Sequence, residues 1–406
     1  MSGLRENTKV MGKMAKLTVK DLELKDKKVL LRCDFNLPQD ENLNITDDTR
    51  IRASLATINY ILNQSPKKLI LISHLGRPDG KVVAKYSLQP VARRLRELLG
   101  REVKMLADCV GETVKKDIDR AQETVILLEN LRFHPEEEKN DPEFSRLLAG
   151  LAEVFVNDAF GTAHRAHAST EGVTHYLKSA SGLLLEKEIN YLGSVLEKPK
   201  KPFVVILGGA KVSDKIMVIE NLLPKADEII IGGGMGYTFL KAQGRKIGNS
   251  KLEKDKIDLA RDILAQAKKQ KVKISLPIDN LVTDKIGEGS RVEIVGEDIP
   301  EGLIGVDIGP NTVENYCANL KTARTIVWNG PLGIFEIDVF ANGTKKVAEF
   351  ISGLKAVTII GGGDTAAAIS KFGLADKMTH ISTGGGASLE FLEGKILPGI
   401  AALTDK

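Results

Sequence analysis

The chain has 406 residues, of which 42% are hydrophobic and 28% are charged, and its formal net charge is +4. This composition is typical of soluble globular proteins and excludes disordered and fibrous chains. The small net charge gives no reason to expect nucleic acid or a membrane surface as a partner. At about 150 residues per domain, the length predicts two or three domains.

The cysteines Cys33, Cys109 and Cys317 are far apart and odd in number, which argues against a disulfide framework and predicts a cytoplasmic location. The sequence has no CxxC pair, so it predicts no thiolate zinc site. No uncharged apolar run approaches the ~18 residues of a membrane helix, and the N-terminus lacks a signal-peptide core. We interpret residues 1–13 as a flexible tail.

Short β-branched runs alternate with amphipathic helical stretches, such as Leu88–Leu99 and Asp255–Lys269, along nearly the whole chain. In the first half the predicted strands are Val29–Cys33, Leu69–Ile72, Val125–Leu128 and Val154–Val156. In the second half they are Phe203–Leu207, Glu228–Ile231, Val272–Ser275, Thr325–Trp328, Val357–Ile360 and His380–Ser382. The runs are apolar on consecutive positions, as expected for parallel strands that are buried on both faces.

This alternation predicts an α/β fold with two domains, each a parallel open sheet flanked by helices. We expect a helix to join the domains and an active-site cleft to lie between them. The predicted ranges are 14–183 for the first domain, 184–200 for the interdomain helix and 201–388 for the second domain.

Residue types are divided unequally at Lys200, inside a proline-punctuated run. Thirteen of the 17 Arg and five of the six His lie before this position, and 27 of the 38 Gly lie after it. The net charges of the two parts are similar, at 32 − 29 = +3 and 26 − 25 = +1. The asymmetry therefore concerns the kind of chemistry and not the total charge.

In the first half, the segments after the strands are polar and basic. They are Arg32–Asn36, Ser73–Arg77, Glu129–His134 and Asn157–Arg165, with Arg50 just beyond the first. Guanidinium groups bind phosphate and carboxylate bidentately, so several at one sheet edge predict a pocket for a small, highly anionic molecule. Asp34 and Asn36 suit a hydroxyl-bearing substrate. His164 and His167 have no acidic or cysteine partner at useful spacing, so we expect hydrogen bonding and not a metal site.

In the second half, the strands run into glycine. These segments are Gly208–Lys211, Gly232–Met235, Asn329–Pro331, Gly361–Thr365 and Gly384–Gly386. Ligands bind beyond the carboxyl ends of parallel strands, and glycine leaves backbone amides open to phosphate there. Tight turns alone explain a single glycine doublet, but five such segments on one edge favour a phosphate site.

Two lysines and an aspartate accompany these glycines. Lys211 and Lys215 lie four residues apart at a helix start, where both could reach a polyphosphate, although a solvated surface pair is the alternative. Asp364 is suited to holding Mg²⁺ between phosphates, and it would serve equally well as a helix N-cap. The chain has no P-loop and no G-x-G-x-x-G motif, so a known mononucleotide or dinucleotide fingerprint is absent.

A site for a nucleoside polyphosphate and a site for a small anion together predict direct phosphoryl transfer. This reaction depends on positioning and on cancelling charge, without a covalent nucleophile. Because the two ligands would bind to separate domains, the transfer would need hinge closure, which also excludes water.

Six segments of the chain resemble the signature of the phosphoglycerate kinase family. They are Arg32–Pro38, Ser73–Pro78, Gly161–His167, Gly208–Lys215, Trp328–Glu336 and Gly361–Thr365. The resemblance extends from about Met14 to the C-terminus. It implies Mg²⁺-dependent, reversible phosphoryl transfer from 1,3-bisphosphoglycerate to ADP, giving 3-phosphoglycerate and ATP. It also implies that residues 389–406 return to the first domain.

The resemblance assigns roles on the side of the acid. Asp34 and Asn36 would bind the glycerate hydroxyl and carboxyl end, and Arg50 would stabilise the migrating phosphoryl group. The phosphate that is not transferred would be held by His74, Leu75, Gly76, Arg77, Arg132 and Arg165.

On the side of the nucleotide, Lys211 would stabilise the migrating group and Lys215 would bind the phosphates, so Arg50, Lys211 and Lys215 form the expected catalytic set. Glu336 would take the ribose hydroxyls, and Asp364 would help to hold Mg²⁺. The remaining nucleotide contacts would come from Gly209, Ala210, Gly232, Gly233, Gly234, Asn329, Pro331, Gly362, Gly363 and Thr365.

Two alternatives stay open, namely a kinase for another small carboxylate and a non-catalytic protein that closes on a ligand. The presence of both Arg50 and Lys211 argues against the second, because binding alone needs no charge on a migrating group. We expect small-molecule substrates, no nucleic-acid or membrane partner, and a monomer.

Overall fold

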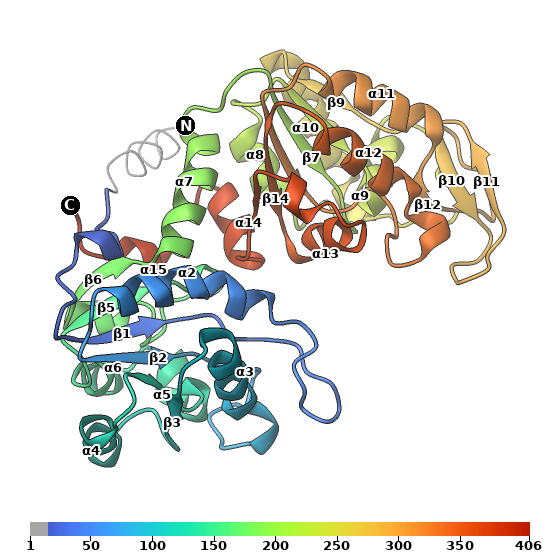
Figure 1. Ribbon diagram of the computed structural model, residues 1–406. Coiled ribbons are helices and arrows are strands. Elements are labelled where there is room, and N and C mark those ends of the chain that lie inside the picture. The colour runs from blue at the N-terminus through green and yellow to red at the C-terminus, as the bar shows by residue number, and fades with distance from the viewer. Residues whose placement is uncertain (1–14) are drawn as a thin grey trace. The chain divides into compact units, whose positions relative to one another are not determined.

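The computed structural model describes residues 15–406, which divide into two compact units (Figure 1). The first unit contains the described residues 15–190 together with Ile396–Lys406, and the second is Tyr191–Lys395. The predicted tail, residues 1–13, lies outside the described residues. No helix of the described part is long and apolar enough to span a membrane.

The first unit is built from a parallel sheet and the helices that connect its strands. Its strands are β1 (Lys28–Arg32), β2 (Lys68–Ile72), β3 (Val103–Met105), β4 (Val125–Leu127), β5 (Val154–Asn157) and β6 (Lys178–Ser181). Its helices are α2 (Thr49–Asn63), α3 (Gln89–Leu99), α4 (Glu112–Arg120), α5 (Pro135–Glu138), α6 (Pro142–Ala149), the start of α7 (Leu183–Glu197) and α15 (Pro398–Ala401).

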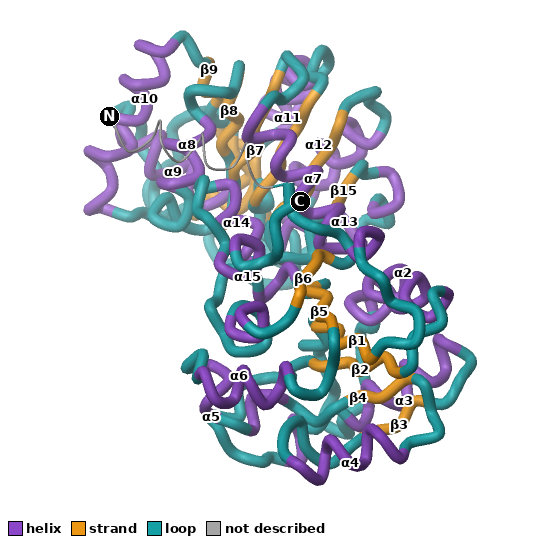
Figure 2. Tube along the Cα trace, turned by 90° about the vertical axis from the view of Figure 1, so that its left-hand side faces the viewer, coloured by secondary structure: helices purple, strands orange, loops and turns teal. Residues whose placement is uncertain are grey.

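All six strands of this sheet are parallel, in the order β3-β4-β2-β1-β5-β6 (Figure 2). Successive side chains of β1 enter two different cores. Val29 and Leu31 pack with residues of α2 and α3, whereas Leu30 packs with residues of α4 and α6. Burial on both faces explains why the central strands are apolar at consecutive positions.

The second unit contains two sheets. Its strands are β7 (Phe203–Leu207), β8 (Glu228–Ile231), β9 (Lys273–Ser275), β10 (Asn280–Thr283), β11 (Val292–Val295), β12 (Ile304–Ile308), β13 (Thr325–Asn329), β14 (Val357–Gly361) and β15 (His380–Ile381). Its helices are α8 (Ile216–Leu222), α9 (Gly233–Ala242), α10 (Ile257–Gln270), α11 (Pro310–Leu320), α12 (Asn342–Ser352), α13 (Gly363–Lys371) and α14 (Gly386–Leu392).

The larger sheet of this unit is again parallel, in the order β15-β14-β13-β7-β8-β9. Trp328 of β13 is fully buried in a core with Tyr316 of α11 and Val347 of α12. Since all the strands run the same way, the segments that follow them lie at one edge of the sheet.

The ten predicted strands coincide with strands of the structure to within one residue at each end, but five further strands were not predicted. Three of these, β10, β11 and β12, form a small antiparallel sheet in the order β11-β10-β12. Strand β11 is largely exposed, and in β12 Gly305 and Asp307 interrupt the run of apolar residues. At the edges of the first sheet, β3 alternates buried and exposed residues, and β6 carries a single apolar residue, Ala180.

The boundary between the units falls within α7, whose predicted range was 184–200. The C-terminal return was predicted to begin at residue 389, and this position is corrected to Ile396. Helix α14 stays with the second unit because Asn221 of α8 donates from Nδ2 to the carbonyl of Leu392 (2.7 Å). Beyond it, the amide of Thr404 donates to the carbonyl of Ser179 in β6 (3.2 Å).

Candidate active site

Basic side chains gather at the carboxyl ends of the strands in the first unit. Arg32 ends β1, His74 follows β2, Arg132 follows β4 and Arg165 follows β5. Burial first, and then the charges of Arg32, Arg132 and Arg50, lower the pKa of His74 well below its ordinary value. These cations therefore lie close enough together to repel a proton from one imidazole, and the edge is suited to a polyanion.

Arg32 fixes the hydrogen-bonding direction of His74. The guanidinium of Arg32 is buried, and its Nη2 lies 3.1 Å from Nδ1 of His74. Because a guanidinium only donates, Nδ1 accepts, and the neutral imidazole carries its proton on Nε2. His74 is thereby set to donate from Nε2 to a bound anion. Arg32 stood in a predicted segment, but it was not predicted as a site residue.

Glu137 supplies a buried negative charge beneath this group. Ser169 bridges the two ions, since Nε of Arg32 donates to its hydroxyl (2.9 Å), which donates to Oε1 of Glu137 (2.6 Å). Burial raises the pKa of Glu137, and the charge of Arg32 opposes this. The sequence did not reveal Glu137, because it lies within the acidic run Glu136–Glu138, which is typical of a solvated surface.

The loop after β2 is held by hydrogen bonds from two other segments, those that follow β1 and β4. Oδ1 of Asn36 accepts from the amide of Gly76 (2.9 Å), and Nη1 of Arg132 donates to the carbonyl of Gly76 (2.9 Å). Nδ2 of Asn130 donates to the carbonyl of Leu75 (2.7 Å). Four predicted residues therefore belong to one connected arrangement, which Asn130, not predicted, completes.

Arg50 lies in the first turn of α2 and forms an ion pair with Asp34, which follows β1. Its side chain is 35% exposed, so the guanidinium is both held and accessible to a ligand. Nε of Arg165 lies 3.2 Å from Nε2 of His164. Arg77 differs from the other predicted cations, because it is exposed and has no ion-pair partner within residues 15–406.

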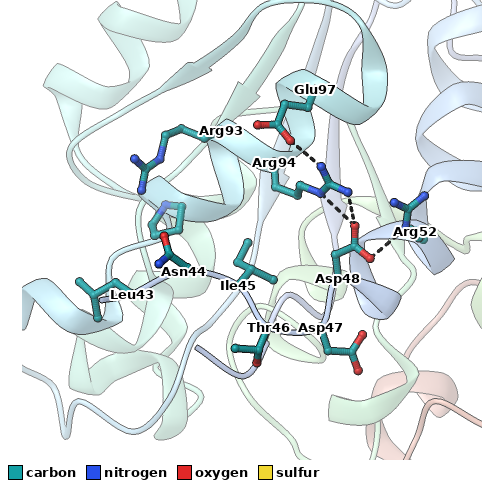
Figure 3. A pocket seen from close by; sticks show the side chains of 11 residues that line it. Leu43, Asn44, Ile45, Thr46, Asp47, Asp48, Arg52, Arg93, Arg94 and Glu97 are labelled. Atoms are coloured by element: carbon teal, nitrogen blue, oxygen red, sulfur yellow. Dashed lines mark hydrogen bonds and ion pairs between the residues drawn. The ribbon is translucent and has the colours of Figure 1, made fainter. Parts of the chain in front are cut away.

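A pocket of about 550 Å³ is lined by residues on both sides of Arg50 in the sequence, but not by Arg50 itself (Figure 3). Asp48 lies in its wall and accepts from Nε of Arg52 (2.8 Å) and from Nη2 of Arg94 (2.8 Å). The aspartate thus neutralises two of the cations there. The pocket does not coincide with the predicted acid site.

His167 provides a test of the charge around this group. Burial first, and then Arg132 and Arg32, lower the pKa of His167 from 6.5 to about 3. Between these values the unfolded chain binds the additional proton, so stability falls as the pH decreases below 6.5. When the pH falls from 6.5 to 5.5, the free energy of unfolding should decrease by about 1 kcal/mol less in His167→Gln than in the wild type.

Urea unfolding at the two pH values measures this difference. An equal loss of stability in the wild type and in His167→Gln would contradict the prediction, because it would mean that His167 is already protonated in the folded protein at pH 5.5.

In the second unit, the glycine segments after β7 and β13 pack backbone against backbone. The amide of Gly208 donates to the carbonyl of Asn329 (3.0 Å), and that of Gly209 to the carbonyl of Pro331 (2.9 Å). A Cβ atom on Gly208 would lie 2.1 Å from the oxygen of Pro331, and one on Gly330 would lie 2.2 Å from the oxygen of Gly208. Only glycine permits this approach, which brings three predicted nucleotide residues together.

Two helices begin directly at glycine segments of this edge. Gly232 precedes α9 and Gly362 precedes α13, and neither residue provides a side-chain cap. In α9, the amide of Gly233 donates to the carbonyl of Leu332 (2.9 Å) and that of Met235 to the carbonyl of Gly209 (3.0 Å). The first turn of α13 has no such bonds within the described residues, so its amides are oriented for an anion. Oγ1 of Thr365 accepts from the amide of Gly330 (2.6 Å), which ties α13 to the segment after β13.

Lys215 is half-buried beside these segments and donates from Nζ to Oδ1 of Asn329. Burial lowers the pKa of Lys215, whereas nearby carboxylates, including that of Asp364, oppose this. Nδ2 of Asn329 is buried and has no hydrogen-bond partner in the described part of the chain. Lys211 is exposed. This edge thus offers two lysines and the unpartnered Nδ2 donor of Asn329 to a ligand.

The remaining predicted nucleotide residues flank this arrangement. A Cβ on Gly234 would lie 3.1 Å from the carbonyl oxygen of Ala210, so the start of α9 packs closely on the turn after β7. Glu336 has an exposed side chain, and its carbonyl accepts from Nζ of Lys371 (3.1 Å). Its carboxylate is accessible to a ligand.

One group of potential metal ligands in residues 15–406 was not predicted. Asp108, Cys109 and His134 each offer a ligand atom, and these atoms lie within 4.8 Å of one another. Nε2 of His134 already pairs with Oδ1 of Asp108 (2.6 Å). The group does not include Asp364, which offers a single exposed carboxylate in the first turn of α13.

A family model described as phosphoglycerate kinase matches residues 19–395. The chain belongs to the phosphoglycerate kinase family. The phosphoglycerate kinase of Pelotomaculum thermopropionicum is 56% identical over 395 residues, covering 97% of this chain and 100% of that protein. The phosphoglycerate kinase of Moorella thermoacetica gives the same identity over 395 residues, with the same coverage of both chains.

Two solved phosphoglycerate kinases share the fold. The structure from Coxiella burnetii has a TM-score of 0.88 at 43% identity and covers 95% of this chain and 98% of that chain. The structure from Pyrococcus horikoshii OT3 has a TM-score of 0.82 at 33% identity, with 95% and 98% covered. The predicted α/β fold with two parallel sheets is confirmed, and the chain is a kinase with a carboxyl group as phosphoryl acceptor.

Proposed function

We propose that this enzyme transfers a phosphoryl group directly and reversibly from 1,3-bisphosphoglycerate to ADP, giving 3-phosphoglycerate and ATP. The observation that carries the proposal is the contrast between two sheet edges. The edge of the first unit presents Arg and His around the buried Arg32, and the edge of the second presents glycine amides with Lys211 and Lys215. The first suits a compact polyanion, and the second suits a nucleoside polyphosphate.

On the first unit, the phosphate that is not transferred would be bound by Arg132, Arg165, Arg77 and the Nε2 proton of His74. Asp34 and Asn36 would take the hydroxyl and carboxyl end of the glycerate, while Leu75 and Gly76 form the adjoining loop. Arg50, held by Asp34, would place its guanidinium on the migrating phosphoryl group, where negative charge concentrates during transfer.

On the second unit, the first-turn amides of α13 would bind the nucleotide phosphates together with Lys215. Lys211 would reach the migrating group, and Glu336 would bind the ribose hydroxyls. Adenine would lie beside Gly232–Gly234, whose lack of side chains lets the start of α9 pack on the segments after β7 and β13; a Cβ on Gly233 would lie 2.8 Å from the oxygen of Pro331.

Mg²⁺ is the proposed cofactor, and Asp364 is the residue proposed to hold it. The carboxylate of Asp364 is exposed at a helix start with uncapped amides, and oxygen is the ligand type that Mg²⁺ prefers. When bound, the ion would cancel charge on the nucleotide phosphates. Thr365 orients this helix start by accepting from the amide of Gly330.

The two substrates would bind to different units, so an in-line transfer requires their ligands to be brought together and water to be excluded. We expect the radius of gyration from small-angle scattering to decrease when 3-phosphoglycerate and MgATP are both present. An unchanged radius would contradict closure.

A coupled assay with the purified full chain tests the proposed function. With MgADP and 1,3-bisphosphoglycerate, we expect ATP at kcat values of about 1–100 s⁻¹ or above, as is typical of kinases. Acetyl phosphate and carbamoyl phosphate serve as competing acyl phosphates. Faster turnover of either would favour a kinase for another small carboxylate, and binding without turnover would leave a ligand-closing protein. The cytoplasmic monomer stays a prediction.

A further inference from the structure

The turn between β7 and α8 carries both lysines that are proposed to act on the phosphates. Lys215 is oriented by its own side chain, which bonds to Asn329. Lys211 is exposed, so the direction of its side chain depends on the backbone of the turn. A hydrogen bond from the amide of Lys215 to the carbonyl of Val212 (2.9 Å) closes the turn but leaves the amides just after Lys211 available.

The carboxylate of Glu253 accepts hydrogen bonds from those amides. Its Oε2 accepts from the amides of Val212 and Ser213 (3.1 Å for Ser213), and its Oε1 accepts from the hydroxyl of Ser213 (2.6 Å). Within residues 15–406, Glu253 is the one side chain that bonds to the backbone of residues 210–214. Hydrogen bonds to an ionised acceptor are roughly twice as strong as neutral ones, so this carboxylate fixes the turn firmly.

Glu253 is itself anchored to the interior of the second unit. It lies between α9 and α10, and its amide donates to Oγ1 of Thr238 (3.3 Å), a buried residue of α9. Burial opposes ionisation of Glu253, but the hydrogen bonds from Ser213 and Val212 prevail, so its pKa is lowered. The group is therefore a carboxylate at neutral pH and connects the turn to α9.

We propose that Glu253 is a positioning residue for Lys211. By holding the peptide groups of Val212 and Ser213, it fixes the direction in which Lys211 leaves the turn toward the migrating phosphoryl group. The inference rests on the proposed role of Lys211 in phosphoryl transfer. A misplacement of about 1 Å in such a group can lower the rate 10²-fold.

The first test compares Glu253→Ala with Glu253→Gln. We expect Glu253→Ala to lower kcat about 10- to 100-fold, and Glu253→Gln to lower it less, because its amide oxygen can still accept. The KM for ADP should stay constant or fall, since a negative charge near the phosphates is removed. Asp255→Ala is the matched control, because Asp255 is exposed and pairs with Lys256 (3.0 Å) instead. It should keep the wild-type kcat.

A double-mutant cycle with Lys211→Ala separates positioning of Lys211 from any other effect. If Glu253 acts through Lys211, adding Glu253→Ala to Lys211→Ala should change kcat by less than about 2-fold. A multiplicative loss in the double variant would overturn the inference, as would a wild-type kcat in Glu253→Ala.

Amide hydrogen exchange gives a readout that does not depend on turnover. In Glu253→Ala, the amides of Val212 and Ser213 should exchange faster than in the wild type, and those of β7 should not change. Unchanged exchange at Val212 and Ser213 would overturn the inference. A wild type without activity would instead contradict the proposed function, and the exchange data would still report whether Glu253 holds the turn.

Discussion

Replacement of Arg50 by alanine should lower kcat by about 10³-fold or more, the scale known for arginine groups that act on a migrating phosphoryl. The ion pair with Asp34 fixes the guanidinium at the start of α2, and its 35% exposure leaves donors for a ligand. The proposed ADP site is built from residues of the second unit. The dissociation constant of ADP should therefore stay near the wild-type value.

Arg52→Ala is the matched control for this prediction. Arg52 lies two residues further along α2, is more exposed and pairs with Asp48, so its loss should change kcat by no more than a few-fold. Arg50→Lys keeps the charge but loses the planar guanidinium, so its kcat should lie between that of the wild type and that of Arg50→Ala. Rapid-mixing kinetics measure kcat, and calorimetric titration measures the dissociation constant of ADP. If Arg50→Ala keeps kcat within 10-fold of wild type, Arg50 has no part in the transfer step.

The parallel sheets could be predicted because the burial of each central strand is visible in its own residues. A strand such as Phe203–Leu207 is buried on both faces, so every position is apolar, and the pattern is local. The strands of the antiparallel sheet have no such run of apolar residues. Val292–Val295 is mostly exposed, and Ile304–Ile308 holds a glycine and a buried aspartate, so neither resembles a buried strand.

The sequence can propose candidate site residues where they directly follow a strand. Lys211, Arg132 and Asp364 were proposed on this ground, and the structure places each of them just after a strand of a parallel sheet. The residues that support them could not be found, because their partners are distant in the sequence. Glu253 contacts a turn about 40 residues earlier, and Glu137 compensates an arginine more than 100 residues before it. In the sequence, both look like ordinary surface acids.

Replacement of Glu137 by alanine should destabilise the first unit by about 3–5 kcal/mol, the usual loss when a buried charge is left without its compensating partner. Ser169 links the two charges in the wild type. Arg32 is 1% exposed, so its charge cannot be solvated by water. Burial lowers the pKa of Arg32, and Glu137 is the strongest of the charges that oppose this. Without Glu137, the guanidinium would remain charged and lose its main compensation.

Three variants separate the charge from the packing. Glu136→Ala removes a more exposed acid of the same helix and should cost less than about 1 kcal/mol. Glu137→Gln keeps an acceptor for Ser169 but loses the charge, so its stability should lie between that of the wild type and that of Glu137→Ala. The double variant Arg32→Met with Glu137→Met should recover part of the loss, because no unpaired charge stays buried.

Urea unfolding followed by circular dichroism measures these differences. Trp328, the single tryptophan, lies in the core of the second unit, so its fluorescence reports that unit alone. The affinity for 3-phosphoglycerate should also fall in Glu137→Ala, because Arg32 would no longer be held against Nδ1 of His74. A loss of stability no larger than that of Glu136→Ala would mean that another group neutralises Arg32. The orientation of His74 rests on its 3.1 Å contact with Arg32 and would be unaffected by that result.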